Sequence, residues 1–325
     1  MYKKAVFHGK IFERQMKYFQ KTKKYVTIGE NGFMNENTLN GYQDFTSETP
    51  FSFSRHSSIG CGGSAKIAFY PRSVAETTAL FQKLERDKIP YFVVGNMTNI
   101  LPPDEGTDKA IVCMKSLHDV AVSDSAFVYA GASSSGFLSA CKRANKSGAE
   151  FLFGVPCTLG GALYMNAGAG GAYISEIVES VLVYEGGKTR ILSMKECEYS
   201  YKKSVFMENG GVILGATLRL ETADETTIKM REQFYKDRRK HLPKGRSMGC
   251  VFKNPEGAFA GDLIERSGLK GLRVGDAKVS EEHANFIIND GNATAREIRA
   301  LISLIKNAVY SQYGVRLEEE IRYLT

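Results

Sequence analysis

The chain has 325 residues with 43% hydrophobic and 11% aromatic content, which is enough for a large core and indicates two domains or slightly more. Its formal charge is +7, but residues 1–24 carry eight basic residues against one glutamate and account for that excess. A basic end on a balanced body argues against nucleic-acid binding, while the lack of a secretory signal or a long apolar run argues against membrane insertion and predicts a cytoplasmic location.

Residues 1–55 show no long apolar period, so we expect an N-terminal extension that leads into the first folded unit. From residue 56 onward the pattern mixes helices and strands. Ser73 and Glu76 have the spacing of a capping box and predict the start of a helix. The apolar residues at helical spacing that should face its core are Val74, Leu80, Phe81 and Leu84. Residues 91–95 then predict a buried strand.

Four further short apolar runs have the composition of strands. They cover residues 111–114, 126–130, 181–184 and 212–220. Gly186 and Gly187 lie between two of the apolar runs and predict a hairpin turn. Because hairpins connect antiparallel strands, we do not expect an all-parallel sheet.

Two more helices are predicted nearer the C-terminus. Thr222 with Glu225 predicts one that runs to about Arg239, and Thr294 with Glu297 predicts the other. The apolar face and the terminating glycine of the second helix are Ile298, Leu301, Ile302, Ile305, Val309 and Gly314. Since strands give way to a charged helix near Glu221, we expect one domain at 56–221 and another at 222–325.

The stretch GVPCTLGGALYMNAGAGG, at residues 154–171, has six glycines in eighteen residues. Glycine leaves backbone N–H groups bare and lets them approach a phosphorylated ligand closely. The apolar residues within it are too many for a flexible glycine and serine linker. We therefore interpret the stretch as a packed ligand cradle.

Two upstream segments have related features. HSSIGCGGSA begins at His56, and VVGNMTNIL, at residues 93–101, leaves a predicted strand through small polar residues that can hold a pyrophosphate. Each segment alone could be a tight turn. No G-x-G-x-x-G pattern of a dinucleotide-binding Rossmann unit and no G-x-x-x-x-G-K-[ST] loop occurs, so neither of those nucleotide-binding folds is expected.

In this order the three segments resemble those of the UDP-N-acetylenolpyruvoylglucosamine reductases, also called UDP-N-acetylmuramate dehydrogenases. The resemblance spans about residues 56–322 and is closest to the shorter type of that family. It implies an α+β protein, with mixed α/β structure, that has the FAD-binding fold of the vanillyl-alcohol-oxidase type in two subdomains and a C-terminal α/β substrate-binding domain. It also implies FAD that is not covalently attached. The residues implied for FAD are Gly95, Asn96, Met97, Thr98, Asn99, Ile100, Pro156, Cys157, Thr158, Gly160, Gly161, Asn166, Ala167, Gly168 and Arg238.

The same resemblance implies the NADPH-dependent reduction of UDP-N-acetylglucosamine enolpyruvate to UDP-N-acetylmuramate, a step of peptidoglycan precursor synthesis. Such a reaction needs an acid near one vinyl carbon and charged groups near the substrate carboxylate. Cys250 in SMGCVFKNP stands where the family has a proton-donating serine, and a thiol, with an ordinary pKa of about 8.5, is a better acid than an alcohol.

Two more catalytic positions follow from the motifs. Glu320 in LEEEIR takes the catalytic carboxylate position of the family pattern L-x-P-E-V-R, with Glu319 in place of proline. Lys202 in YSYKKSVF replaces an arginine and keeps its charge but loses the planar fork. The residues implied for substrate binding are Tyr201, His241, Asn254, His283 and Arg322.

Six cysteines are widely spaced and form no C-x-x-C pair, so neither a metal site nor a disulfide framework is expected. Five of them should be small apolar core residues: Cys61, Cys113, Cys141, Cys157 and Cys197. Two other functions stay open. Lys202 and His241 are also compatible with a non-catalytic relative that binds flavin or a nucleotide sugar, and the flavin half alone would suit an oxidase. The oligomeric state does not follow from the sequence.

Overall fold

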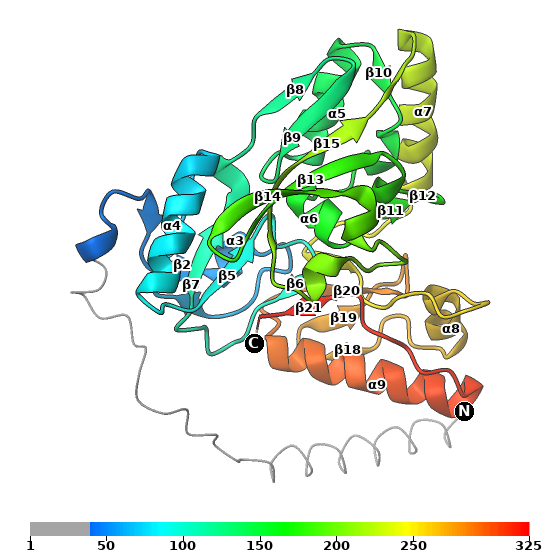
Figure 1. Ribbon diagram of the computed structural model, residues 1–325. Helices are drawn as coiled ribbons and strands as arrows, with labels where there is room; N and C mark the ends of the chain where they lie inside the picture. Colours follow the sequence, from blue (N-terminus) through cyan, green and yellow to red (C-terminus); the bar gives the residue numbers. More distant parts are fainter. Residues whose placement is uncertain (1–39, 325) are drawn as a thin grey trace, which may run out of the picture. The chain divides into compact units, whose positions relative to one another are not determined.

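The computed structural model describes residues 40–324 (Figure 1), so the basic segment at 1–24 lies outside the described residues. The first sheet has the strand order β1-β4-β7-β5. Strands β4, β7 and β5 run parallel to one another, whereas β1 is antiparallel to β4. The strands span Ser47–Glu48 (β1), Ala68–Phe69 (β4), Tyr91–Val94 (β5) and Ala110–Cys113 (β7).

Helix α4 (Val74–Arg86) covers this sheet and begins where its sequence predicts. The Ser73 hydroxyl accepts a hydrogen bond from the Glu76 N–H at 3.1 Å, but the Glu76 carboxylate binds the N–H of Arg72, so only half of the capping box forms. Three of the four predicted core residues are fully buried, and Val74 is half-buried. In β5 only Val94 is buried and the other three residues are half-buried, so the predicted strand is present but is not fully buried.

The second sheet is antiparallel and has the order β14-β13-β15-β9-β8. Its strands span Val120–Val122 (β8), Ser125–Tyr129 (β9), Val178–Glu185 (β13), Lys188–Ser193 (β14) and Val212–Arg219 (β15). Gly186 and Gly187 form the predicted two-residue turn, with φ of 57° and 80°. Positive φ at both positions suits the twist of a tight hairpin and favours glycine. The predicted strands are therefore confirmed, each with small differences at its ends.

Helices α5 (Ser134–Arg143), α6 (Leu159–Tyr164) and α7 (Glu225–Arg238) accompany the second sheet (Figure 1). The predicted start of α7 at Thr222 is wrong, because the side chain of Asp224 caps the helix by accepting from the Thr227 N–H at 2.8 Å. Lys142 of α5 forms an ion pair with Glu232 of α7 at 2.7 Å. Since α7 packs on the first half of the chain, we propose that the domain boundary lies after α7 instead of near Glu221.

The C-terminal part is a four-stranded antiparallel sheet, β17-β20-β19-β18, with α8 (Ala260–Arg266) and α9 (Ala295–Tyr313). Its strands span Ser247–Cys250 (β17), Arg273–Val274 (β18), Ala277–Val279 (β19) and Phe286–Asn289 (β20). Thr294 and Glu297 form a complete capping box, and Gly314 ends α9 with φ of 69°. All five predicted apolar residues of α9 are buried, so the prediction for this helix is confirmed.

The chain end returns to the first half of the molecule. Strand β21 (Arg322–Tyr323) pairs in parallel with β6 (Ile100–Leu101), which follows the first sheet's β5. The Asn289 side chain donates to the carbonyl of Ile59 at 2.8 Å, and Ser58 donates to the carbonyl of Ser247 at 2.6 Å. These contacts join the HSSIG segment to the C-terminal sheet, so two distant parts of the sequence meet along one seam.

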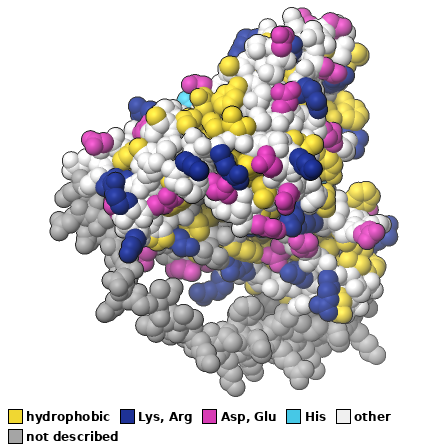
Figure 2. All heavy atoms as spheres, viewed as in Figure 1, with side chains coloured by type: hydrophobic (Ala, Val, Ile, Leu, Met, Phe, Trp, Pro, Cys, Tyr) yellow, Lys and Arg dark blue, Asp and Glu magenta, His cyan; other side chains and the backbone are white. Residues whose placement is uncertain are grey.

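Shorter elements connect these layers. The remaining strands and helix are Phe51–Ser52 (β2), Phe53–His56 (α3), Ser64–Ala65 (β3), Lys146–Ser147 (β10), Gly168–Ala169 (β11), Ala172–Tyr173 (β12) and Glu221–Thr222 (β16). Short 3-10 helices cover Asn40–Tyr42, Met114–Ser116, Glu150–Leu152, Ile174–Glu176, Met194–Cys197 and Val205–Met207. Within residues 40–324, none of the helices has the length and apolar character needed to cross a bilayer. Acidic and basic side chains are interspersed on the face in Figure 2.

Candidate active site

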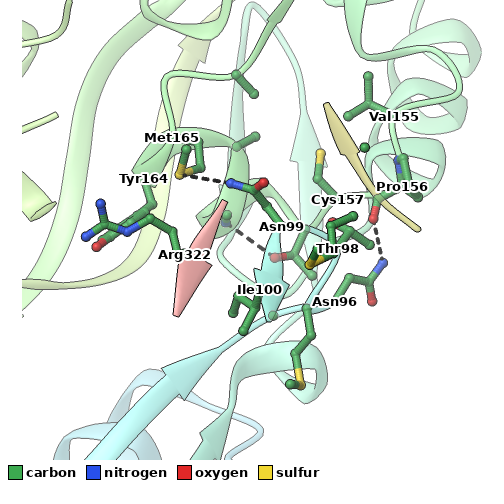
Figure 3. Close-up of a pocket in the computed structure, with 18 of the residues that line it drawn as sticks. Asn96, Thr98, Asn99, Ile100, Val155, Pro156, Cys157, Tyr164, Met165 and Arg322 are labelled. Carbon is green, nitrogen blue, oxygen red and sulfur yellow. Dashed lines mark hydrogen bonds between the residues drawn. The ribbon is translucent and has the colours of Figure 1, made fainter. Parts of the chain in front are cut away.

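A cavity of about 1410 Å³ lies where the glycine-rich segments meet the C-terminal part. Pockets for drug-sized ligands usually have about 300–1,000 Å³, so this one has room for a dinucleotide. Its wall contains residues of the 93–101 segment, the 153–168 segment, the loop after α7 and the last strand. Figure 3 shows that Asn99, Met165 and Arg322 come together here from three separate segments.

The turn after β5 presents free backbone donors to the cavity. The N–H groups of Asn96, Met97 and Thr98 donate no hydrogen bond to any other residue of the described chain. The Asn96 side chain donates to the carbonyl of Pro156 at 3.2 Å (Figure 3), which ties this turn to the 154–171 stretch. Consecutive free amides in a turn favour a phosphate or another anionic group. Met97 has φ of 52°, which explains why the resembling motif has glycine there.

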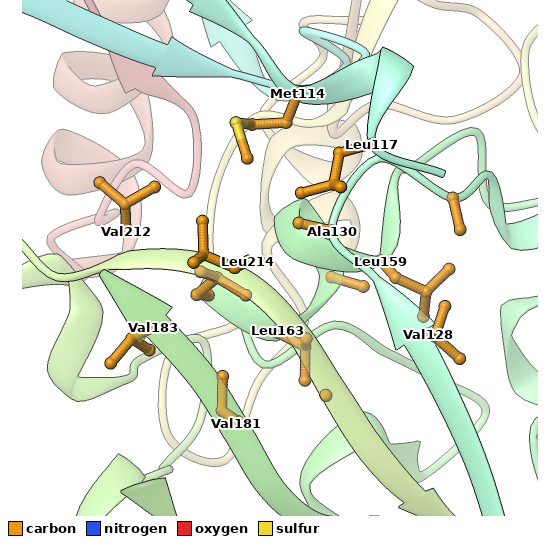
Figure 4. Close-up of a cluster of buried hydrophobic side chains, with 14 of the residues drawn as sticks. Met114, Leu117, Val128, Ala130, Leu159, Leu163, Val181, Val183, Val212 and Leu214 are labelled. Atoms are coloured by element: carbon orange, nitrogen blue, oxygen red, sulfur yellow. The ribbon is translucent and has the colours of Figure 1, made fainter. Parts of the chain in front are cut away.

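Gly95 and Gly160 are required by close packing. A Cβ on Gly95 would lie 2.2 Å from the Thr158 hydroxyl oxygen, and one on Gly160 would lie 2.9 Å from the Cβ of Ala130. Behind them, Leu159 and Leu163 of α6 pack into the core of the second sheet (Figure 4). The 154–171 stretch is therefore anchored as predicted, but these two glycines allow segment-to-segment contact rather than contact with a ligand.

Most of the residues predicted to bind FAD line the cavity. They are Gly95, Asn96, Met97, Thr98, Asn99, Ile100, Pro156, Cys157, Thr158, Gly160, Gly161, Ala167 and Gly168. Asn166 is buried outside the lining, where its side chain donates to the carbonyl of Ser200 at 2.9 Å and accepts from the Ser175 N–H at 3.2 Å. Asn166 therefore holds the segment that carries Lys202.

Lys202 and Glu320 form an ion pair in the cavity wall. The Lys202 Nζ lies 2.7 Å from Oε1 of Glu320, and the two side chains are only 16% and 14% exposed. Burial pushes the pKa of Lys202 down, but the charge and the hydrogen bond of Glu320 outweigh it and leave this pKa raised. The Lys202 ammonium is thus charged at neutral pH. The two residues are 118 positions apart in the sequence, and the structure brings them together as the motifs predict.

Cys250 faces the same cavity from the end of β17. The N–H of Glu320 donates to the carbonyl of Val251 at 2.7 Å, so the segments that carry Cys250 and Glu320 lie side by side. Burial raises the pKa of the Cys250 thiol to about 11, and Glu320 adds to this rise while Lys202 and Arg239 oppose it. The thiol therefore keeps its proton at neutral pH and can act as an acid. The five other cysteines are buried, as predicted.

Arg239, instead of its neighbour Arg238, lines the cavity. The Nε of Arg239 lies against Gly154, where an added Cβ would come within 3.0 Å. Burial lowers the pKa of this guanidinium, and it forms no ion pair with a carboxylate among residues 40–324. Arg238 is exposed and stacks on the ring of Phe234 at 5.2 Å. The motif match places the arginine contact on Arg238, whereas the arginine of this pair that lines the cavity in the structure is Arg239.

These adjacent arginines form a matched pair of variants. We expect Arg239→Ala to weaken FAD retention by about tenfold or more, since a charge-assisted contact contributes about 1.5–3 kcal/mol. Arg238→Ala should change FAD retention by about twofold or less, because Arg238 lies outside the cavity wall and surface substitutions usually change free energies by no more than about 0.5 kcal/mol. Equilibrium dialysis of the released flavin measures both. A larger loss in the Arg238 variant would contradict this placement.

The residues predicted to bind substrate are less concentrated. Arg322 lines the cavity, whereas the other four lie outside its wall. Tyr201 is 43% exposed, and its hydroxyl accepts from the N–H of Asn254 at 3.2 Å. The Asn254 side chain in turn accepts from the Ala260 N–H at the start of α8.

The two histidines are also outside the wall. His283 accepts a hydrogen bond from the Asn285 N–H at 3.2 Å and packs edge-on against Phe286, and burial lowers its pKa so that it is neutral. His241 is exposed. Their assignment to substrate stays a prediction.

The cavity suits FAD on three observations of this chain. Its volume fits a dinucleotide, its turn at 96–98 offers three free amides for a pyrophosphate, and its wall includes apolar side chains that can enclose a ring. Asn96, Thr98 and Arg239 are the groups that would hold it. Among residues 40–324, no three His, Cys, Asp or Glu side chains are placed to hold a metal ion.

Two family models match this chain. One, described as the UDP-N-acetylenolpyruvoylglucosamine reductase C-terminal domain, covers residues 240–324, and the other, described as an FAD binding domain, covers residues 65–193. The first match begins just after α7, which ends at Arg238. The cavity is lined by residues of both matched regions.

Curated relatives agree with these models. A UDP-N-acetylenolpyruvoylglucosamine reductase from Caldanaerobacter subterraneus subsp. tengcongensis is 40% identical over 272 residues, which cover 82% of this chain and 90% of that protein. One from Clostridium tetani is 35% identical over 298 residues, covering 87% and 97%. The crystal structure of a UDP-N-acetylenolpyruvylglucosamine reductase (MurB) from Thermus caldophilus has 32% identity and a TM-score of 0.76, and the match covers 86% of this chain and all of that one.

Proposed function

The chain belongs to the UDP-N-acetylenolpyruvoylglucosamine reductase family, and we propose that it reduces UDP-N-acetylglucosamine enolpyruvate to UDP-N-acetylmuramate, with NADPH as the reductant. The product is a peptidoglycan precursor, and a cytoplasmic site of action is part of the proposal. The family models and the similar crystal structure show an oxidoreductase that has an FAD binding domain and a C-terminal domain of this reductase family. When bound, FAD supplies two-electron redox chemistry between the two substrates.

The observation that carries the proposal is the convergence of an acid and an ion pair on one cavity. In the net reaction the enolpyruvyl double bond is saturated by two new C–H bonds, while NADPH is oxidised to NADP⁺ and one proton is consumed. Cys250 donates the proton to one carbon and regains it from water. Its high pKa keeps the thiol in the donor form.

The negative charge on the substrate must also be stabilised until the proton has been transferred. Negative charge develops toward the substrate carboxylate, and the Lys202 ammonium in the cavity wall can offset it. Glu320 keeps that ammonium charged and fixes its direction. Because the pair is only 14–16% exposed, the interaction is screened less by water than one at the surface.

The pH dependence of the substrate-reducing step tests the proton donor. We expect its rate constant to stay level from pH 7 to about 10 and to fall only toward pH 11, where Cys250 loses its proton. An unperturbed thiol would give a fall near pH 8.5. Anaerobic stopped-flow measurement of the rate constant over this pH range distinguishes the buried thiol from an unperturbed one. A decline centred near pH 8.5 would contradict donation by the buried thiol.

The whole proposal is tested by separating the two half-reactions. The purified protein should contain flavin that NADPH bleaches without air, and UDP-N-acetylglucosamine enolpyruvate should then restore its absorbance. Bleaching without substrate-dependent recovery would favour a catalytically impaired relative. Recovery with oxygen alone would favour an oxidase. Neither alternative gains support from the described residues, since Lys202, Cys250 and Glu320 all line the cavity.

A further inference from the structure

We propose that Glu319 is a positioning residue, which holds the backbone in the place from which its neighbour Glu320 reaches Lys202. The inference rests on the proposed function, in which the pair of Lys202 and Glu320 acts in the site. It concerns three consecutive glutamates that are chemically equivalent in the sequence. The structure gives each of them a different partner.

The segment that carries the glutamates is extended and pairs with the segment that follows Cys250. The N–H of Lys253 donates to the carbonyl of Glu318 at 2.9 Å, and the N–H of Glu320 donates to that of Val251 at 2.7 Å. Side chains alternate along extended chain, so Glu319 points away from the side that Glu318 and Glu320 share. Glu318 pairs with Lys253 at 2.5 Å and is 72% exposed.

Both oxygens of the Glu319 carboxylate are engaged on the opposite side. Oε1 lies 2.7 Å from the Nζ of Lys306 in α9, and Oε2 accepts a hydrogen bond from the Tyr323 hydroxyl. Burial and the neighbouring carboxylate raise the pKa of Tyr323, so its hydroxyl stays a donor. The Arg299 guanidinium lies 4.4 Å from the centre of the same ring. The carboxylate is thus fixed by one helix and by β21.

Charge alone leaves the register of this segment ambiguous. A slip of one residue along an extended segment turns every side chain to the other face, and a run of three glutamates would still present a carboxylate on both faces. The register is specified by the buried Leu317 and Ile321 on either side of the run. The contacts of Glu319 with Lys306 and Tyr323 then hold the backbone in place beside α9. Glu320 then reaches Lys202 with the 2.7 Å geometry.

Proline offers an independent way to hold the same backbone. The N–H of Glu319 donates no hydrogen bond within the described residues, so proline would remove none there. Proline also fixes φ and favours extended backbone at the preceding residue. Glu318 already accepts from the Lys253 N–H in the extended pairing, whose bridge joins Glu319 to Phe252. The resembling family pattern has proline at this position, and here the side-chain contacts of Glu319 would do the same work.

The test compares Glu319→Ala, Glu319→Pro and Glu318→Ala in the flavin-loaded protein. We expect Glu319→Ala to lower the substrate-dependent rate constant by about 10- to 100-fold, since small displacements of a catalytic group can cost about a hundredfold. Flavin bleaching by NADPH should change by less than about twofold, as should the KM for NADPH. Glu319→Pro should restore most of the loss, whereas Glu318→Ala should resemble the wild type.

A second measurement does not depend on turnover. Cys250 faces Glu320, Lys202 and Arg239, so moving Glu320 away leaves two cations beside the thiol. Alkylation of Cys250 by iodoacetamide at pH 8.5, followed by mass spectrometry, should therefore be about threefold faster or more in Glu319→Ala, because the thiolate fraction changes tenfold per pKa unit. Glu319→Pro should return to the wild-type rate.

Equal alkylation and equal substrate-dependent rates in Glu319→Ala and Glu318→Ala would overturn the inference. A wild-type protein that fails to turn over the substrate would refute the proposed function instead, and the alkylation rates would still decide the role of Glu319. If Glu319→Ala does not fold, Tyr323→Phe removes one of the two contacts and should shift the alkylation rate in the same direction. No shift there would also count against the anchor.

Discussion

Replacing Cys250 by alanine is expected to slow substrate reduction by about 100- to 10,000-fold, the range that general acid catalysis contributes. Alanine removes the proton that the high pKa of this thiol preserves, and it changes no charge in the resting site. Bleaching of the flavin by NADPH should stay within about twofold of the wild type, because that step needs no donor at position 250. Anaerobic stopped-flow absorbance resolves the two steps.

Serine is the matched control at this position. A hydroxyl can donate a proton and is nearly the same size as the thiol, so Cys250→Ser should retain far more activity than Cys250→Ala. If alanine and serine reduce the rate equally, the loss comes from packing. If both leave substrate reduction unchanged, Cys250 is not the proton donor.

Replacing Glu320 by glutamine should have the second-largest effect. The shape is kept, but the Lys202 ammonium loses its counter-ion in a wall where both side chains are less than 20% exposed. We expect the substrate-dependent rate constant to fall by about 100- to 1,000-fold, as on loss of one preorganised electrostatic group. Stopped-flow measurement at saturating substrate tests this.

Stability should fall as well. Breaking a fully buried pair costs about 3–5 kcal/mol, and because this pair faces a cavity we expect a smaller loss of about 1–3 kcal/mol in the free energy of unfolding. Glu318→Gln is the control, since its exposed pair with Lys253 should contribute about 0–1 kcal/mol. Urea unfolding of both variants measures the difference. Equal stability and equal rates in the two variants would show that the buried pair has no special role.

The direction of pH dependence for this pair follows from Lys202. Its folded-state pKa is raised, so its contribution to stability is fully present below the ordinary lysine pKa and is lost as the pH rises through the raised value. The loss should therefore appear only in strongly alkaline solution. In Glu320→Gln the cause of the rise is removed while the burial remains, so the folded-state pKa of Lys202 should fall below the ordinary lysine value. The sign then reverses, and the stability of this variant should rise as alkaline pH removes the charge from Lys202.

Features encoded within a few residues could be predicted well. Helix α9 shows this, because its capping box, its apolar spacing and its terminal glycine are all local signals, and all three occur in the structure. The hairpin at Gly186 and Gly187 is another, since positive φ at two successive positions is a property of the turn itself. The start of α7 was predicted incorrectly. Thr222 and Asp224 can both cap a helix by residue type, and only Asp224 has the capping geometry in the structure.

The site could be predicted only in part. Ordered motifs predicted that Lys202, Cys250 and Glu320 share one site, and all three line the same cavity. Each motif is specific enough to give its residue a register. They placed the arginine contact on Arg238, since two adjacent arginines at the end of a helix look alike in a motif. Which of the two faces the cavity depends on the rotation of the last helical turn. No local signal carries that information.

Glycine pattern, capping residues and strand composition therefore sufficed for the mixed α and β fold and for the segments that form the site, since these depend on backbone preferences of near neighbours. Tertiary packing decided the rest. It placed the Lys202 ammonium 2.7 Å from the Glu320 carboxylate, gave three equal glutamates three different partners, and buried the Cys250 thiol until its pKa rose to about 11. Electrostatic interactions and burial depend on groups that are distant in sequence and close in space.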